Sequence, residues 1–171
     1  LENRNKQVEL INRIISAAIQ TMDINEIFTK TSKELAEIIQ FDEMNIGLLT
    51  ADGRSMKIHT SYGEAIPYRD TVVPIDKTVA QFAIRAESPM VFPDLAADQK
   101  YASLLSFERG MRSQLSIPIT LKGKTLGALN VLSREPYVFT DDHIPILQPV
   151  AQQIGVIIDR VQLFKQVSED A

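Results

Sequence analysis

The sequence predicts an α+β domain in which helices at both ends of the chain flank a set of strands. Near each end, apolar residues recur every three or four positions, which is the period of an amphipathic helix. Between Met44 and Tyr62 they alternate with polar residues instead, as in a strand. The chain has 171 residues, 44% of them hydrophobic and 23% charged, so we expect one domain with an ordinary core.

Two helices are predicted before the first strand. The first spans 8–22, with apolar residues at Val8, Ile11, Ile15, Ala18 and Met22. Asp23 and Glu26 form the acidic version of a capping box, so the chain should break near Met22 and a second helix should begin. We expect that helix to bury Ile27, Phe28, Thr31, Leu35, Ile38 and Ile39.

The middle of the chain is predicted to hold the sheet. Alternating residues at 44–49 and 56–62 flank the turn signal Asp52-Gly53, which indicates a hairpin. Short strands are expected at 71–75 and 90–92, with a helix between them that Asp76 caps and Pro89 ends.

Residues 96–110 have no firm period and should form a loop or short helices. Strands at 113–121 and 125–133 follow. In these strands Pro118 indicates an edge, or a position without a ladder bond, and Gly127 a close approach of another segment.

Thr140 is expected to cap a long last helix, supported by Asp141 and Asp142, and His143 to serve that same terminus. Pro145 and Pro149 should bend or loosen it. Its apolar seam is Leu147, Val150, Ile154, Ile157, Val161 and Phe164. This seam suits either packing on the domain's own sheet or a coiled coil with a second chain.

The composition excludes several kinds of site. The chain has no Cys, which rules out disulfides, thiol catalysis and thiolate zinc sites. Because His59 and His143 are its two histidines, we expect no metal site and no zinc catalysis. The formal charge is −4 and there is no basic tract, so nucleic acid is not an expected partner.

Neither secretion nor membrane contact is expected of this segment. Residues 1–5 do not begin a signal peptide, and no apolar run approaches the roughly 20 residues that cross a bilayer. We therefore expect a cytoplasmic protein. Since the chain starts without Met and both ends are predicted helices, we also expect it to be a segment of a longer protein.

One series of motifs resembles the GAF domain family, and the resemblance covers nearly the whole chain. The matching segments are 112–119 (RSQLSIPI), Gly123, 126–131 (LGALNV) and 139–142 (FTDD), preceded by 88–94 (SPMVFPD). The resemblance implies an antiparallel sheet of five or six strands, with the N- and C-terminal helices on one face and a ligand-pocket region on the other. In this scheme 1–22 is an outer helix, 23–139 the core and 140–171 a signalling helix.

The resemblance also indicates which cofactors are not expected. Cyclic-nucleotide-binding members carry a signature of Asn-Lys, then Phe, then Asp-Glu. The positions of this chain that align with it are Ser133-Arg134, Phe139 and His143-Ile144, so only Phe139 matches. Bilin-binding members attach their chromophore through Cys. We therefore expect neither a cyclic nucleotide nor a covalent bilin, and no cofactor is assigned.

The candidate ligand-binding residues are Met44, His59, Phe82, Phe92, Asp94, Tyr101, Arg109, Met111 and Arg112. Each has a structural alternative. The apolar residues suit a dry core equally, His59 is more often simply solvated, and Asp94 favours an Asx turn. Arg109 and Arg112 can meet an anionic ligand, or Arg112 can pair with the loop.

The resemblance implies a non-enzymatic sensory domain of a signal-transduction protein, such as a histidine kinase of a two-component system. It would bind an unknown small molecule and signal through a homodimer of its terminal helices to a covalently attached downstream output domain. The expected dimer residues are Ile11, Ile15, Ala18, Leu147, Ile154, Ile157, Val161 and Phe164. The alternatives are a ligand-free structural dimerisation module and a PAS-like sensor. No catalytic residue is assigned, since catalytic motifs are missing.

Overall fold

The computed structural model describes residues 5–11, 13–14 and 24–170, with side chains described as far as Arg160. Its centre is a six-stranded antiparallel sheet of order β3-β2-β1-β6-β5-β4. The strands are β1 (Glu43–Leu49), β2 (Ser55–Gly63), β3 (Val72–Pro74), β4 (Met90–Phe92), β5 (Ser113–Leu121) and β6 (Lys124–Ser133). The predicted α+β class is confirmed, with six strands.

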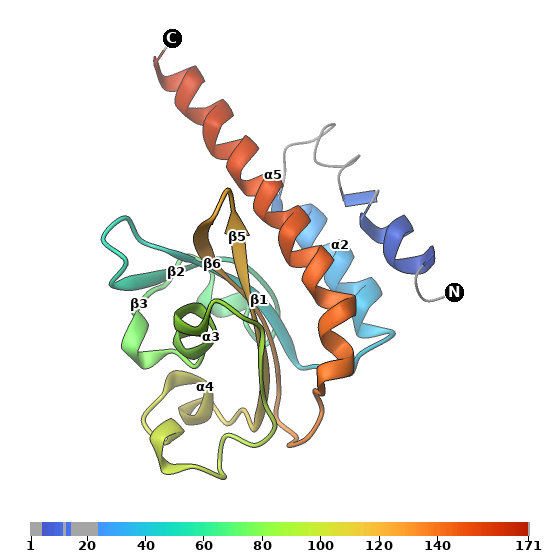
Figure 1. The fold of residues 1–171 in the computed structure, drawn as a ribbon, viewed down its shortest axis with the longest axis vertical. Helices are drawn as coiled ribbons and strands as arrows, with labels where there is room; N and C mark the ends of the chain where they lie inside the picture. Colours follow the sequence, from blue (N-terminus) through green and yellow to red (C-terminus); the bar gives the residue numbers. More distant parts are fainter. Residues whose placement is uncertain (1–4, 12, 15–23, 171) are drawn as a thin grey trace.

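The helices divide between the two faces of this sheet. The longer ones, α2 (Ile24–Ala36) and α5 (Ile144–Asp170), lie on one side, and the short α3 (Ala80–Ala86) and α4 (Leu105–Glu108) lie on the other (Figure 1). The short turns η1 (Ile66–Tyr68), η2 (Ile75–Lys77) and η3 (Gln99–Tyr101) lie in the segments that join β2 to β5. The predicted arrangement of terminal helices on one face is therefore confirmed.

The main core lies between the sheet and the long helices. From α2 it takes Ile27, Phe28 and Leu35, as predicted, and Thr31 and Ile39 are buried too. Ile38, also predicted to be buried, is 57% exposed, because α2 ends at Ala36 and Ile38 lies in the turn beyond it. The predicted break near Met22 and the Asp23 cap lie outside the described residues.

The N-terminal segment is helical at 5–11 and 13–14. Leu10 and Ile14 contribute to the core, whereas Val8 is 52% exposed. Leu10 and Ile14, which widen the predicted apolar stripe, therefore pack on the domain, whereas Val8, predicted on the same stripe, does not. Ile15 and Ala18 lie outside the described residues.

The start of α5 follows its prediction. Thr140 and His143 form a capping box: the Thr140 backbone N–H donates to His143 Nδ1 over 3.1 Å, and the Asp142 N–H donates to Thr140 Oγ1. A short turn, η4 (Asp141–His143), joins this cap to α5. Pro145 is tolerated near the helix start, where its missing N–H has no intrahelical partner, and α5 continues past Pro149.

The seam of α5 packs inside one chain as far as the structure describes it. Leu147, Val150, Ile154 and Ile157 all belong to the main core, and Ile157 is only 4% exposed. The sequence left two roles open for this seam. Its first part, from Leu147 to Ile157, packs on the domain's own sheet. The side chains of Val161 and Phe164 lie outside the described part, although the ribbon of α5 continues beyond the sheet (Figure 1).

The segment before α3 corrects one expectation. Asp76 does not cap that helix, because residues 75–77 form η2 and α3 begins at Ala80 without a side-chain cap. Gln81 instead donates from its amide to the Asp76 and Thr78 carbonyl oxygens, over 3.1 and 2.7 Å. After α3, Glu87 takes a left-handed conformation with φ 53°, and the chain turns into β4.

Two unusual strand residues have the roles that the sequence indicated. Pro118 lies on β5 past the end of β4, which pairs only with residues 114–116, so no strand flanks Pro118 on that side. Gly127 lies where β6 approaches β1 closely. A Cβ added there would meet the Gly47 carbonyl oxygen at 1.9 Å, so only glycine fits.

Gly127→Ala is therefore expected to lower the free energy of unfolding by about 2 kcal/mol or more, because backbone must move to admit the methyl group. Gly47→Ala is the matched control, since its added Cβ would meet the mobile Met56 Cε, at 2.8 Å. Urea unfolding of both variants measures the difference. Equal losses would contradict the close approach of the two backbones.

Candidate functional site

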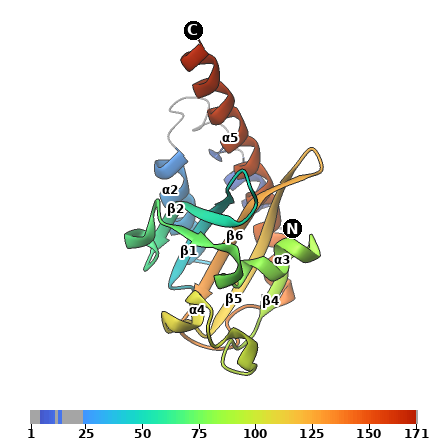
Figure 2. The same ribbon diagram turned by 90° about the vertical axis from the view of Figure 1, so that its left-hand side faces the viewer.

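A cavity of about 230 Å³ opens on the face of the sheet away from α2 and α5. Figure 2 shows this face, with α3 and α4 in front of the sheet. The cavity floor is formed by β1, β2, β5 and β6, and the walls by η1, β3 and the starts of α3 and α4. Its lining residues are Glu43, Asn45, Gly47, Met56, Ile58, Ala65, Tyr68, Thr71, Val73, Thr78, Val79, Ala80, Leu105, Ser106, Arg109, Gln114, Asn130 and Leu132.

A chain of buried hydrogen bonds crosses the floor from strand to strand. Asn130 on β6 donates from its amide to Asn45 Oδ1 on β1 over 3.0 Å, and accepts from the Ser116 hydroxyl on β5 over 2.7 Å. The register of the sheet causes this, because Asn130 lies directly opposite both Asn45 and Ser116. Buried polar groups on three strands thus satisfy one another.

Both ends of this chain reach the segment that contains α4. At one end, Gln114 donates to Ser116 Oγ over 2.9 Å and accepts from the Ser106 hydroxyl of α4 over 2.7 Å. At the other end, Asn45 donates to Glu43 Oε2 over 3.2 Å. Glu43 in turn binds Arg109, the residue that follows α4. The polar chain therefore fastens α4 to the sheet at two points.

The Glu43 and Arg109 side chains form an ion pair at the floor of the cavity. Arg109 Nη1 lies 3.3 Å from Glu43 Oε2, and Nη2 donates to Oε1. The Glu43 side chain is fully buried, and this burial raises the pKa of its carboxyl, an effect that the Arg109 charge partly offsets. Tyr68 covers the guanidinium, with its ring centroid 4.1 Å from Arg109 Cζ.

A second ion pair lies beside the cavity, at the ends of β2 and β6. Arg134 donates from Nε to both Glu64 carboxylate oxygens, over 2.8 and 3.0 Å, and this holds the Glu64 pKa below its usual range. Arg134 Nη1 also donates to the Arg109 carbonyl oxygen over 3.1 Å. This pair therefore helps to fix the backbone that carries Arg109.

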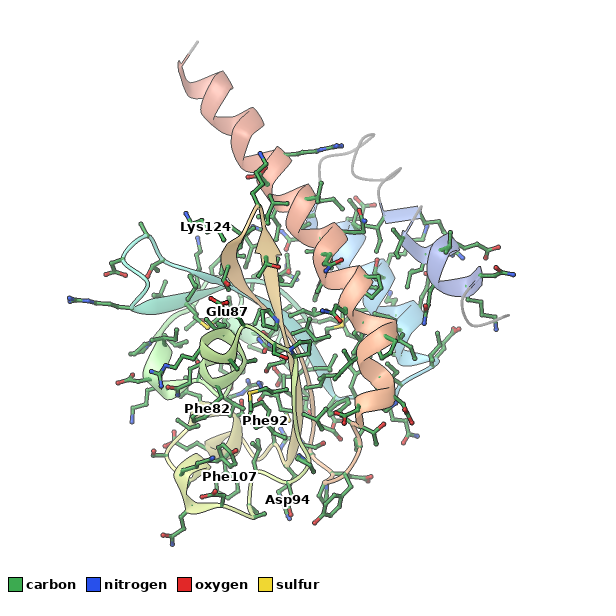
Figure 3. All side chains as sticks on the ribbon, in the orientation of Figure 1. Phe82, Glu87, Phe92, Asp94, Phe107 and Lys124 are labelled. Atoms are coloured by element: carbon green, nitrogen blue, oxygen red, sulfur yellow. The ribbon has the colours of Figure 1, made fainter. Side chains whose placement is uncertain are left out.

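Of the nine candidate ligand residues, Arg109 lines the cavity and the other eight do not. Met44 belongs to the main core under the long helices. Phe82, Phe92, Tyr101 and Met111 belong to a second apolar cluster beside the cavity, in which Phe82 of α3 lies next to Phe92 of β4 (Figure 3). On β2, Ile58 lines the cavity and the next residue, His59, is not part of its lining.

Asp94 and Arg112 form an ion pair with each other and do not line the cavity. Arg112 donates from Nε and Nη2 to the two Asp94 carboxylate oxygens, each over 2.9 Å. Asp94 Oδ1 also accepts from the Ala96 backbone N–H over 3.0 Å, which is the Asx turn that the sequence favoured. The structural alternatives for both residues are thus confirmed.

The sequence analysis missed most of the cavity floor. Glu43, Asn45, Gln114 and Asn130 are polar residues within largely buried strands. The usable signal was their spacing. Glu43 and Asn45, like Gln114 and Ser116, are two residues apart and therefore share a face of the sheet. The hydrogen bonds that join the strands needed the register, which the sequence does not supply.

Within the ranges that the structure describes, no group of three or more His, Asp or Glu side chains is placed to hold a metal ion. In the same ranges, no helix has both the length and the apolar character that crossing a membrane requires.

Asp94→Asn is expected to lower stability near pH 7 and to have little effect near pH 2. The Arg112 hydrogen bonds and the Ala96 N–H depress the Asp94 pKa in the folded state. Their contribution is therefore present above the unfolded pKa of about 3.9 and is lost as pH falls through the folded value. Urea unfolding at both pH values measures it, and an equal loss at both would contradict this pair.

Comparison with known proteins agrees with this geometry. A family model described as a GAF domain matches residues 21–159. A comparison with curated proteins found no match.

Several solved structures share the fold at low sequence identity. The GAF domain of an Acinetobacter phosphoenolpyruvate-protein phosphotransferase is 14% identical, with a TM-score of 0.76, over 94% of this chain and 98% of that one. The phycocyanobilin-bound GAF domain of a cyanobacterial phytochrome is 17% identical, with a TM-score of 0.74, over 92% and 96%.

A third similar structure is an enzyme. The free methionine-R-sulfoxide reductase of Neisseria meningitidis, solved in complex with its substrate, is 17% identical, with a TM-score of 0.73, over 92% of this chain and 90% of that one. The fold is thus used for catalysis as well as regulation. Since the family model spans most of the chain, and the sheet and its two helical layers are those of GAF structures, this chain belongs to the GAF domain family, a fold used for sensing and small-molecule binding.

Proposed function

We propose that this domain is a non-enzymatic sensor that binds a small molecule in the cavity over the sheet. The observation that carries the proposal is the cavity itself, with its polar floor on the sheet and its apolar walls on short, separate elements. Small-molecule sites commonly combine apolar walls with a few placed polar groups. The walls here come from η1, β3, α3 and α4, which are short segments that can shift when the cavity is filled.

The similar structures support a cavity ligand and limit its chemistry. The cyanobacterial GAF domain is bound to phycocyanobilin. Our chain has no Cys, so no thioether bond to a bilin can form, and a ligand would bind non-covalently. Without Cys the chain also has no thiol for redox chemistry. This supports a regulatory role here in place of the reductase activity of the Neisseria protein.

We propose that the domain forms a homodimer and passes its signal on through the layer of helices. The C-terminal part of α5 runs beyond the sheet, which suits a connection to a covalently attached output domain, such as a cytoplasmic histidine kinase of a two-component system (Figure 1). Ligand binding would favour one packing of the helices over another. A PAS-like fold, weighed as an alternative, is replaced by the GAF assignment.

The proposed dimer surface differs from the expected one where the structure describes the side chains, whereas the side chains of Ile15, Ala18, Val161 and Phe164 lie outside the described part and stay predicted dimer residues. Leu147, Ile154 and Ile157 are buried within one chain and Ile11 is half-buried. The proposed dimer surface instead includes two exposed apolar side chains on the helical layer, those of Val8 and Ile38. Ile38 borders a groove between the N-terminal segment, α2 and α5, which is lined by Lys6, Gln7, Leu10, Leu35, Ile38, Ile146 and Val150.

One observation favours a second function, a ligand-free dimerisation module. The polar side chains of the cavity floor already bind one another, so each has at least one hydrogen-bond partner without a ligand. In that case the cavity would be a packing feature and only the helical surface would act.

Native mass spectrometry of the purified domain separates these two functions. We expect a native mass that exceeds the denatured mass by a small molecule, or a rise in melting temperature with a metabolite set, because a ligand that prefers the folded state stabilises it. If neither extra mass nor stabilisation is observed, the dimerisation module is the function that remains.

Ile38→Glu is expected to halve the mass measured by sedimentation, because it places a charge on the proposed dimer surface without entering the core. Ile66→Glu is the control: Ile66 is similarly exposed, at 53% against 57%, but lies in η1, which forms a wall of the cavity on the opposite side of the sheet. A wild-type monomer, or a dimer that Ile38→Glu leaves intact, would rule out this surface.

A further inference from the structure

The cavity has a balanced charge. Among its described lining residues, Glu43 is the one carboxylic acid and Arg109 the one strong base, and they form one ion pair. The charges next to it are balanced in the same way, because Glu64 and Arg134 pair with each other. A ligand that enters therefore finds no spare charge of either sign.

Arg109 is the group that an anionic ligand would need, and it is already engaged. Its Nη1 and Nη2 atoms donate to Glu43, and the Tyr68 ring covers the guanidinium at 4.1 Å. A ligand carboxylate would have to displace Glu43, which is fully buried and would lose its partner. Leaving a buried charge unpaired is strongly unfavourable, so the cavity opposes an anion.

A cationic ligand is opposed for the complementary reason. It would compete with Arg109 for Glu43 and would bring a second positive charge close to the guanidinium. The remaining lining groups are neutral, and dipoles of neutral amides and hydroxyls do not repay the loss of water around a full charge.

The same lining suits an uncharged ring system. The apolar lining residues include Met56, Ile58, Val73, Val79, Leu105 and Leu132. Asn45, Gln114 and Asn130 each donate one hydrogen bond within the floor, and each amide nitrogen carries a second N–H for a ligand acceptor. The volume of about 230 Å³ exceeds the roughly 150 Å³ of a cavity that holds benzene, and lies below the roughly 300 Å³ at which drug-sized sites begin.

We propose that the cavity selects an uncharged ligand of one or two rings that carries a hydrogen-bond acceptor, and that Glu43 sets this selectivity by neutralising Arg109. The proposal rests on the proposed ligand-binding function and specifies its chemistry. It replaces the expectation that Arg109 receives an anionic ligand. Glu43 acts as a specificity-determining residue, because its carboxylate occupies the guanidinium that would otherwise attract an anion.

Three probes of equal shape test the proposal: 2-naphthamide, which is neutral, 2-naphthoate, which is anionic, and 2-naphthamidine, which is cationic. Isothermal titration calorimetry with the wild-type domain is expected to give the neutral probe an affinity at least about tenfold above either charged probe, since each charged probe is desolvated without a counter-charge.

Glu43→Gln should reverse this preference. The amide keeps the size of the side chain and one accepting oxygen, but it removes the negative charge and leaves the Arg109 charge unpaired. We expect 2-naphthoate to gain about tenfold or more in affinity and to overtake 2-naphthamide. Glu64→Gln is the control. It removes an acid that pairs with Arg134 and lies outside the cavity lining, so the preference for the neutral probe should persist.

Arg109→Gln gives an independent test if Glu43→Gln does not fold, as judged by circular dichroism. It leaves Glu43 without its cation, so 2-naphthamidine should gain affinity and 2-naphthoate should not. Wild-type binding of 2-naphthoate in preference to 2-naphthamide would overturn the charge selectivity and leave ligand binding intact. Failure of 2-naphthamide to bind would also overturn the inference, whereas the proposed function fails only if the native mass shows no retained molecule and the metabolite set gives no rise in melting temperature.

Discussion

The buried Glu43 carboxylate constrains the whole cavity face of the sheet. A carboxylate taken out of water must be paired and hydrogen-bonded, and here Arg109 and Asn45 meet that need. Because Arg109 follows α4, the requirement brings α4 onto the sheet. The position of α4 in turn creates a wall of the cavity, so satisfying one buried charge shapes the site.

The two faces of the sheet are consequently stabilised in different ways. The helical face is closed by apolar packing from α2 and α5, which is non-directional and tolerates small shifts. The cavity face depends on directional hydrogen bonds that run through Asn45, Asn130 and Ser116. A change in the cavity can therefore alter the hold on α4 while the helical core keeps the sheet in place.

Local patterns accounted for most of the fold. The strands, the Thr140 cap and the Asp94 turn were predicted because each depends on residues close together in the chain. The errors arose where more than one local solution existed. Asp76 resembles a helix cap, but Gln81 supplies the hydrogen bonds to the backbone before α3.

The sequence by itself determined most of the elements through periodicity and capping residues, and its short motifs carried the GAF resemblance, which implied the two-sided arrangement. Only the tertiary structure decided what faces the cavity. The Glu43 and Arg109 side chains meet across 66 positions of sequence, and Asn45 and Asn130 across 85. Such contacts depend on strand register and on the path of the segment after β4, which no local pattern specifies.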